Sequence, residues 1–365
     1  MSLPTGIDGG LAVTGAALVL PPDAPGGGPR WPDGPPEGWF DHRTRLGPRG
    51  YKYLPAAAQY LLAAARGAAA DGGGLDLVPE DRRGSALALN GALAGLFDRM
   101  DRQVAAEGGA DALSPATAPY FAASVLGSRL AAEHGLKGFA LTLATPGTAA
   151  LEAVEAGARA LAAGRCAALF VGAAEHALPK GAGEPGEQGA AALVLEHPAA
   201  AEARGAAVHA LVRARSLHVL PRSLTDGAGR ARLTATVTGA LDRLLAAAGP
   251  GARAPEPHYV LDGSPVAALT RAAVDGALAI RPAAPPAPGA LALDAPPGAV
   301  PPGAVPLGAG SLAAAVGLVR LVTGEPGDRL LVVAGGRGHI AFVLLSALGR
   351  PPVRPHGPER EGNPC

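Results

Sequence analysis

The chain has 365 residues, a formal net charge of zero at pH 7, 48% hydrophobic residues and 4% aromatic residues. Zero net charge gives no electrostatic reason to expect binding to nucleic acid or an anionic membrane, and no uncharged apolar run is long enough to span a bilayer. The N-terminus lacks the basic and apolar regions of a signal peptide, and the two cysteines, Cys166 and Cys365, make no disulfide framework. A cytoplasmic protein with reduced thiols is expected, its core built from Ala, Leu and Val.

Strand-like and helical segments alternate along the first part of the chain. In chain order, the predicted elements are a buried strand at 11–20, a Pro- and Gly-rich loop at 21–38, a helix at 55–70, a strand at 83–89, helices at about 92–106 and at 120–133, and a buried strand ending at 196. Before the first helix lies WFDHRTRLGPRGYKYL (39–54), which is basic and aromatic. This segment either faces a substrate or partner, or is a surface loop anchored by its aromatic residues.

The centre of this alternation is GFALTLATPGTAALEAVEAGARALAAGRCAALFVGAAE (138–175). Its apolar start predicts a short strand, the TPG that follows predicts a sharp turn, and the segment from Thr148 to about Ala163 repeats apolar residues at helical spacing. Gly164 is expected to close the helix, and a second strand follows. This order presents a nucleophile at a helix N-terminus, where backbone N–H groups favour an anion. The turn at 145–148, however, has no Cys, Ser or Asp at its tip.

The second part of the chain repeats the scheme. The predicted elements are a strand at 207–219, a helix at 231–248, a short strand at 259–261, a helix at 265–277, a Pro-rich connection at 282–306, a helix at 311–323, and a closing hairpin with strands at 330–334 and 340–345. Residues 199–205 are expected to join two comparable halves, at 1–198 and 206–350, and residues 351–365 are expected to be a disordered tail. The alternation predicts an α/β fold made of two related parts.

Five stretches that run in order through nearly the whole chain give it a family resemblance. They are FDHRTRLGPRG (40–50), LSPATAP (113–119), the central stretch at 138–175, GEQGAAALVLE (186–196) and GGRGHIAFVLL (335–345). In these stretches the sequence resembles the β-ketoacyl synthases of the thiolase superfamily. The resemblance implies a thiolase-like, five-layered αβαβα fold of two pseudo-symmetric halves. It also implies an obligate dimer whose active sites lie beside the interface.

The resemblance also identifies the positions of the family's three catalytic side chains, and none of them is retained here. Gly147 stands where the family has a nucleophilic Cys, and it has no side chain to form a thioester. Asp262, in DGSPV (262–266), stands where the family has its first His, and Ala309 stands where it has the second. The Lys that precedes the second His is also missing, because residues 282–329 contain neither His nor Lys.

Loss of the thiol together with both imidazoles removes acyl attachment, decarboxylation and oxyanion stabilisation at once. This pattern is similar to that of the chain length factor, the non-catalytic partner of the ketosynthase in type II polyketide systems. On that resemblance, the chain forms a heterodimer with a catalytic ketosynthase in polyketide or fatty-acyl biosynthesis and shapes the acyl tunnel. The helix at 120–133 and the elbow would contribute to the interface and the tunnel. Acyl carrier protein would be met mainly through the partner, and no metal ion or organic cofactor is implied.

Two other functions stay open. An acyltransferase or condensing enzyme with a rearranged active site would use Thr145, Thr148 or Asp262. A homodimeric scaffold would instead hold an acyl-carrier substrate for another enzyme. The simpler interpretation of Thr148 is that it begins the helix, and the simpler interpretation of Asp262 is that it forms a turn.

The candidate tunnel or pocket residues are Thr145, Pro146, Thr148, Gly336 and His339. The small residues at the degenerate catalytic positions suggest room in this pocket. The glycine cluster GGRG that contains Gly336 does not have the G-x-G-x-x-G spacing of a dinucleotide loop, so it is interpreted as a hairpin turn.

Overall fold

The computed structural model describes residues 10–22, 36, 38–176, 186–249, 253–281, 305–306 and 310–349. The predicted tail at 351–365 and the predicted position Ala309 lie outside the described residues, as does most of the Pro-rich connection. The strands are β1 (Leu11–Val19), β2 (Arg83–Ala88), β3 (Ala140–Leu143), β4 (Ala168–Glu175), β5 (Gly189–Glu196), β6 (Ala210–His218), β7 (Glu256–Leu261), β8 (Val305–Pro306), β9 (Gly327–Ala334) and β10 (His339–Ala347). The α-helices are α1 (His42–Arg45), α2 (Ala56–Asp71), α3 (Ala94–Glu107), α4 (Val125–His134), α5 (Ala149–Ala162), α6 (Pro198–Ala203), α7 (Gly227–Ala246), α8 (Pro265–Ala279) and α9 (Leu312–Val322).

The strand order reveals two halves of identical topology. The described strands form a 10-stranded sheet in the order β3-β2-β4-β5-β1-β6-β10-β9-β7-β8. In the first half β3, β2 and β4 are parallel and β5 and β1 follow antiparallel; in the second half β8, β7 and β9 are parallel, and β10 and β6 follow antiparallel. The halves join where residues 11–13 of β1 pair with residues 210–212 of β6. The predicted α/β fold of two related parts is confirmed.

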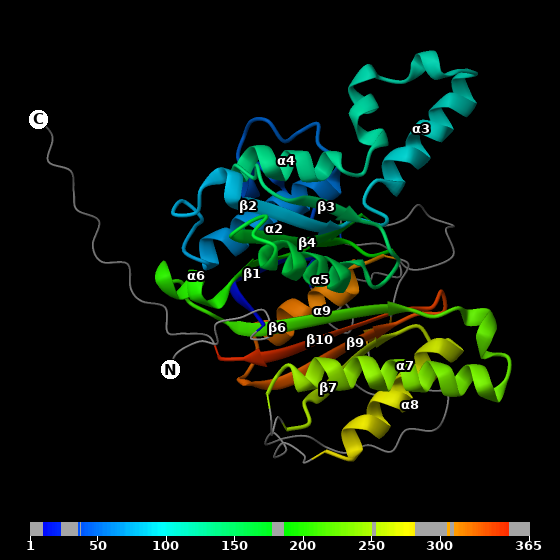
Figure 1. Ribbon diagram of the computed structural model, residues 1–365. Coiled ribbons are helices and arrows are strands. Elements are labelled where there is room, and N and C mark those ends of the chain that lie inside the picture. Colours follow the sequence, from blue (N-terminus) through cyan, green and yellow to red (C-terminus); the bar gives the residue numbers. More distant parts are fainter. Residues whose placement is uncertain are drawn as a thin grey trace, which may run out of the picture.

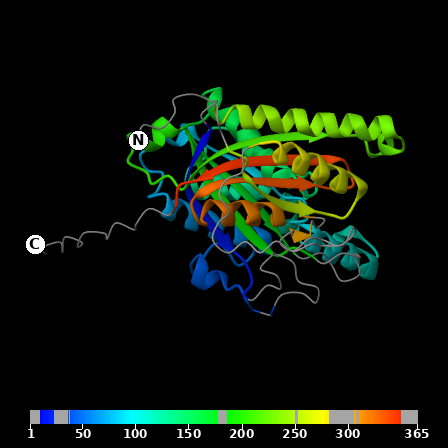
Figure 2. The ribbon, with the colours of Figure 1, turned by 90° about the horizontal axis from the view of Figure 1, so that it is seen from below.

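Five layers are stacked in the structure. Helices α2 and α4 cover one side of the first half of the sheet, and α7 and α8 cover the opposite outer side of the second half (Figure 1). Helices α5 and α9 lie between the two halves and contact strands of both. Figure 2 shows α7 and α8 side by side over the second half. The predicted αβαβα arrangement is therefore correct, and it places the start of α5 in the interior.

The central helix α5 shows why small residues dominate this core. Leu151 and Val154 are at most 1% exposed, and a Cβ at Gly157 would lie 2.2 Å from Cδ2 of Leu169 on β4. The helix can approach the sheet this closely because glycine has no side chain there. After the helix ends, Gly164 has φ 67°, which confirms its predicted role as the left-handed residue that closes the helix.

The helix predicted at 120–133 is the element that differs most. Residues Pro115–Phe121 form a 3-10 helix with Pro119 inside it, and α4 begins only at Val125. The predicted start at residue 120 therefore falls inside the 3-10 helix, and the regular helix begins five residues later. Among the described residues, no helix combines the length and apolar character needed to cross a bilayer.

Candidate functional site

The turn between β3 and α5 has a glycine at its tip. Gly147 is buried with φ 75°, a left-handed conformation that glycine adopts without steric cost. Its N–H donates to the carbonyl oxygen of Gly310 over 2.9 Å. Gly310 directly precedes Ser311, the N-cap of α9. The elbow of the first half therefore touches the start of the matching helix in the second half.

Two predicted threonines converge on one carboxylate. The Thr145 hydroxyl donates to Oε2 of Glu152 over 2.8 Å, and the Thr148 hydroxyl donates to Oε1 over 2.6 Å. Thr148 is the N-cap of α5, as expected, but its side chain makes no bond to the helix N–H groups. Glu152 lies in the first turn of α5, where the helix dipole stabilises a negative charge. The pair of hydroxyls and the carboxylate is the most polar feature of the elbow.

His339 is within electrostatic range of this carboxylate. It begins β10, pairs in register with His218 on β6, and its ring centroid is 4.7 Å from that of His218. Burial lowers the pKa of His339, the neighbouring His218 lowers it further, and the charge of Glu152 opposes the shift. His339 is therefore electrostatically linked to the elbow through Glu152.

Asp262 joins two turns of the second half. Its Oδ1 accepts from the N–H of Ser264 over 3.1 Å, which is the turn geometry expected from the sequence. Its Oδ2 accepts from the N–H of Gly336 over 2.5 Å. Gly336 belongs to the predicted hairpin turn between β9 and β10, which is confirmed by the bond from the Gly338 N–H to the Gly335 carbonyl. Both carboxylate oxygens of Asp262 thus accept hydrogen bonds from backbone N–H groups.

Two further carboxylates lie buried beside the start of α9. Glu175 accepts from the N–H and hydroxyl of Ser311 and from the N–H groups of Asn90 and Gly91. Burial raises the pKa of Glu175, and these hydrogen bonds oppose the shift. Oε2 of Glu187 accepts from the N–H groups that follow Ser311. These carboxylates fix the N-terminus of α9 against the elbow.

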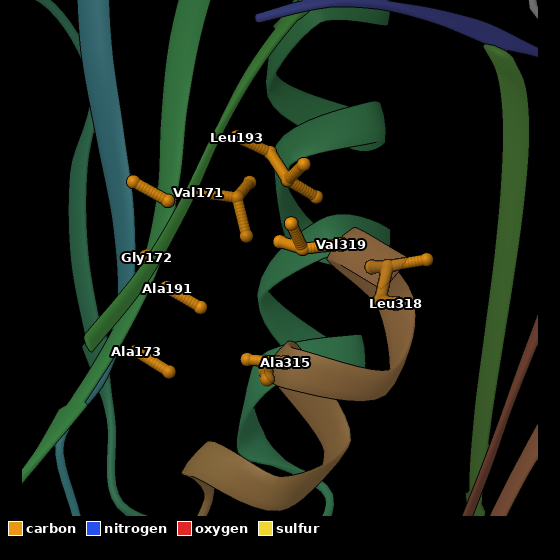
Figure 3. A pocket seen from close by; sticks show the side chains of 10 residues that line it. Val171, Gly172, Ala173, Ala191, Leu193, Ala315, Leu318 and Val319 are labelled. Carbon is orange, nitrogen blue, oxygen red and sulfur yellow. The ribbon is translucent and has the colours of Figure 1, made fainter. Parts of the chain in front are cut away.

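A small apolar cavity lies in the core between α9 and strands β4 and β5. It has a volume of about 10 Å³ and is lined by residues such as Ala150, Leu193 and Val319 (Figure 3). A cavity of this size is at the lower limit for a single water, and its apolar lining gives a water no partner. It is a packing defect below the elbow and has no room for an acyl chain.

The structure brings together part of the predicted set. Thr145 and Thr148 meet at Glu152, with His339 in electrostatic range; Asp262 and Gly336 meet at a second point. Glu152 was not predicted from the sequence. The available signal was its position in the first turn of a helix that begins at a threonine, since carboxylates are favoured there.

The family comparison agrees with this architecture. Residues 37–214, which include the elbow, match the family described as "Beta-ketoacyl synthase, N-terminal domain". This match covers just under half of the chain. Among curated proteins, none matches the sequence significantly.

Solved ketosynthase structures share the fold across nearly the whole chain. A chain of AntDE:AntF, a type II PKS acyl-carrier protein in complex with its ketosynthase bound to the hexaketide, is 16% identical with a TM-score of 0.65, covering 93% of this chain and 99% of that one. The ishigamide ketosynthase/chain length factor is 22% identical with a TM-score of 0.62, covering 93% and 100%. A β-ketoacyl synthase from Burkholderia phymatum STM815 is 14% identical with a TM-score of 0.57, covering 93% and 99%.

The chain has a cysteine close to the elbow helix, but it is not placed for catalysis. Cys166 lies after the far end of α5, is 2% exposed, and packs in the central core. Burial raises the pKa of its thiol to about 11, so the thiol is protonated near neutral pH. Because the thiolate is the nucleophilic form, Cys166 does not replace the missing side chain at the elbow.

Proposed function

We propose that this chain is a non-catalytic ketosynthase homologue that acts like a chain length factor. The observation that carries the proposal is the elbow, where Gly147 occupies the predicted nucleophile position and uses its N–H to bind the Gly310 carbonyl. A glycine offers no atom that can hold an acyl group. Asp262, at the first predicted histidine position, has both oxygens engaged by backbone N–H groups. The chain would work in the cytoplasm, with acyl carrier protein reaching it mainly through its partner.

The proposed partner is an intact ketosynthase subunit, and two features support a protein interface in the first half. Among the described strands, β3 lies at the edge of the sheet and pairs with β2 alone. α3 stands clear of the layers (Figure 1), and Met100 is its one buried residue. Phe121 is 65% exposed while its ring stacks on Phe97 of α3 at 6.0 Å. An exposed aromatic side chain and an open strand edge are each typical of an association surface.

The placement of the elbow supports the proposed tunnel-shaping role. Because α5 begins at the end of the edge strand β3, a subunit that paired at β3 would sit beside Thr145 and Pro146. We propose that side chains around this turn limit the length of the acyl chain that the partner extends. The type II polyketide or fatty-acyl pathway is part of the same proposal.

One observation favours a second function, an acyl-transfer enzyme with a rearranged site. Glu152 accepts from both Thr145 and Thr148, and a carboxylate can take a proton from a hydroxyl nucleophile. Thr148 is 0% exposed, which leaves Thr145 as the more accessible hydroxyl. In that case the purified chain would be acylated by malonyl-loaded or acyl-loaded carrier protein. Peptide mass spectrometry would place the acyl group on Thr145, and Thr145→Val would abolish it.

The deciding experiment is co-expression with an intact Cys-His-His ketosynthase, followed by size-exclusion chromatography and product analysis. The proposal expects a stable one-to-one complex whose products are lost or shortened without this chain. A homodimer that becomes acylated alone would establish the rearranged enzyme. A homodimer that binds carrier protein without acylation would establish the scaffold.

A point variant tests the proposed interface. Phe121→Ser should weaken the heterodimer at least tenfold, because it removes an exposed aromatic anchor, and aromatic residues commonly dominate interface energies. Ile280→Ser is the matched control, since Ile280 is 85% exposed on the second half, at the end of α8. Equal effects of both variants on the dissociation constant would contradict an interface at Phe121.

A further inference from the structure

A half-open groove lies where the two halves of the sheet separate. It has a volume of about 270 Å³ and is lined by the start of β1, residues 212–215 of β6, one turn of α5 and the last turn of α7. β1 pairs with β6 only as far as Val212, and β6 then continues beside β10 alone. The groove is therefore formed by the divergence of the two strands, and helices α5 and α7 form its walls.

Three arginines line this groove. Arg213 and Arg215 alternate with Val212 and Ala214 along β6, and all four residues line the groove. Arg243 comes from α7. Three guanidinium groups from two separate elements thus border one groove.

Gly10, which directly precedes β1, makes room for the side chain of Arg213. Gly10 has φ 83°, and a Cβ at this position would lie 3.3 Å from Cγ and 3.4 Å from Cζ of Arg213. Any side chain here would press on the guanidinium group as well as adopt a disfavoured backbone conformation. Gly10 therefore lets Arg213 lie along the groove wall.

The described lining of the groove carries arginines but no carboxylate. The carboxylate at its margin, Glu155, already has several partners. Glu155 accepts from the N–H and hydroxyl of Ser216, pairs with Arg159 at 2.5 Å, and lies 3.8 Å from Arg215. Within the described part of the chain, the guanidinium of Arg243 makes no hydrogen bond or ion pair. Arg213 has an interaction of its own, so the donors that can meet an anion in the groove are those of Arg243 and Arg215.

The floor of the groove is apolar. Leu11, Val212 and Leu244 line it, and each is buried to 7% exposure or less. A volume of this order suits a small molecule rather than a protein helix. Arginine recognises carboxylate and phosphate groups through paired N–H donors, while an apolar floor accepts a hydrocarbon.

We propose that this groove binds a small amphiphilic anion, in which a carboxylate or phosphate group meets Arg215 and Arg243 and a short hydrocarbon lies on the apolar floor. The site is separate from the elbow, because the lining residue of α5 is Ala158, more than two turns from Thr148. The inference does not depend on the proposed heterodimer, and either can fail without the other.

The test uses the full chain and isothermal titration calorimetry with three probes of equal chain length: hexanoate, hexyl phosphate and hexanol. The proposal expects saturable binding of at least one anion and no saturable binding of hexanol. Comparison of the two anions identifies the preferred headgroup. Arg243→Gln should weaken anion binding at least tenfold, because it replaces a charge-assisted hydrogen bond by a neutral one. Arg232→Gln, which changes an exposed arginine on α7 outside the groove, should leave the dissociation constant within twofold.

Arg215→Gln provides a second, independent variant from a different element, and it should also weaken binding. Circular dichroism and thermal unfolding would verify that each variant is folded. The proposal is overturned if neither anion binds at millimolar concentration, if hexanol binds as well as the anions, or if Arg243→Gln binds the anion as tightly as Arg232→Gln.

Discussion

Removal of the Arg204 side chain should strongly destabilise the first half of the fold. Arg204 Nε and Nη2 bind Oε2 and Oε1 of Glu196 at 2.8 and 2.5 Å, and Nη1 donates to the carbonyl of Gly72 over 3.0 Å. The two side chains are 11% and 1% exposed. In Arg204→Met, the Glu196 carboxylate would stay buried with the Thr14 hydroxyl as its remaining donor. Breaking a buried pair in this way costs about 3–5 kcal/mol.

Urea unfolding, followed by far-UV circular dichroism and compared at equal m-value, measures this cost. The double variant Glu196→Gln/Arg204→Met should regain about 1–3 kcal/mol of the unfolding free energy that Arg204→Met loses. A neutral amide needs no counter-charge, and its oxygen still accepts from Thr14. Arg102→Met is the matched control: Arg102 pairs with Asp98 but is 69% exposed, so the loss should be about 0.5 kcal/mol or less. A cost below about 1 kcal/mol for Arg204→Met would refute the reasoning, since that is the range of exposed pairs.

Two further predictions concern the core. Burial lowers the pKa of His134, whose ring lies 4.9 Å from that of Phe170, so the folded chain holds its neutral form. This contribution to stability is present above the unfolded pKa of about 6.5 and is lost as the pH falls below it. The melting temperature should therefore decrease from about pH 7.5 to 5.5, and less so in His134→Phe; equal decreases would contradict this. Leu193→Ala should cost about 2–5 kcal/mol in urea unfolding, because it enlarges the cavity of Figure 3, whereas Ile280→Ala should change stability by about 0.5 kcal/mol or less. A cost for Leu193→Ala as small as that for Ile280→Ala would mean that the cavity collapses in the variant.

The elements of the central stretch could be predicted because local signals there agree with the tertiary structure. Apolar spacing, the Thr148 start and the Gly164 end all indicate the same helix, and α5 occupies Ala149–Ala162. The start of the helix predicted at 120–133 was wrong, because residues 115–121 form a 3-10 helix. The regular helix α4 therefore begins only at Val125.

The contacts of the site could be predicted only in part. Asp262 was expected to form a turn from its DGSP context, and it does, but its bond to Gly336 joins residues 74 positions apart. The convergence of both threonines on Glu152 depends on the angle between the elbow and the helix. The arginine groove arises where β1 and β6 diverge, so its members at positions 213, 215 and 243 show no sequence pattern that unites them.

The strand pairing within each half also determines the order in which the chain can fold during synthesis. β1 completes its ladder only with β5, whose paired residues lie at 190–196, and β6 completes its ladder only with β10, at 339–347. At a synthesis rate of about 5–20 residues per second, the first strand waits roughly ten seconds or more for its partner. Once residue 196 has emerged, the first half can complete its strand pairing. In the second half, β6 must likewise wait until β10 has been synthesised. Folding is therefore expected in two successive long-range steps, with β1 dependent on protection from aggregation during the first.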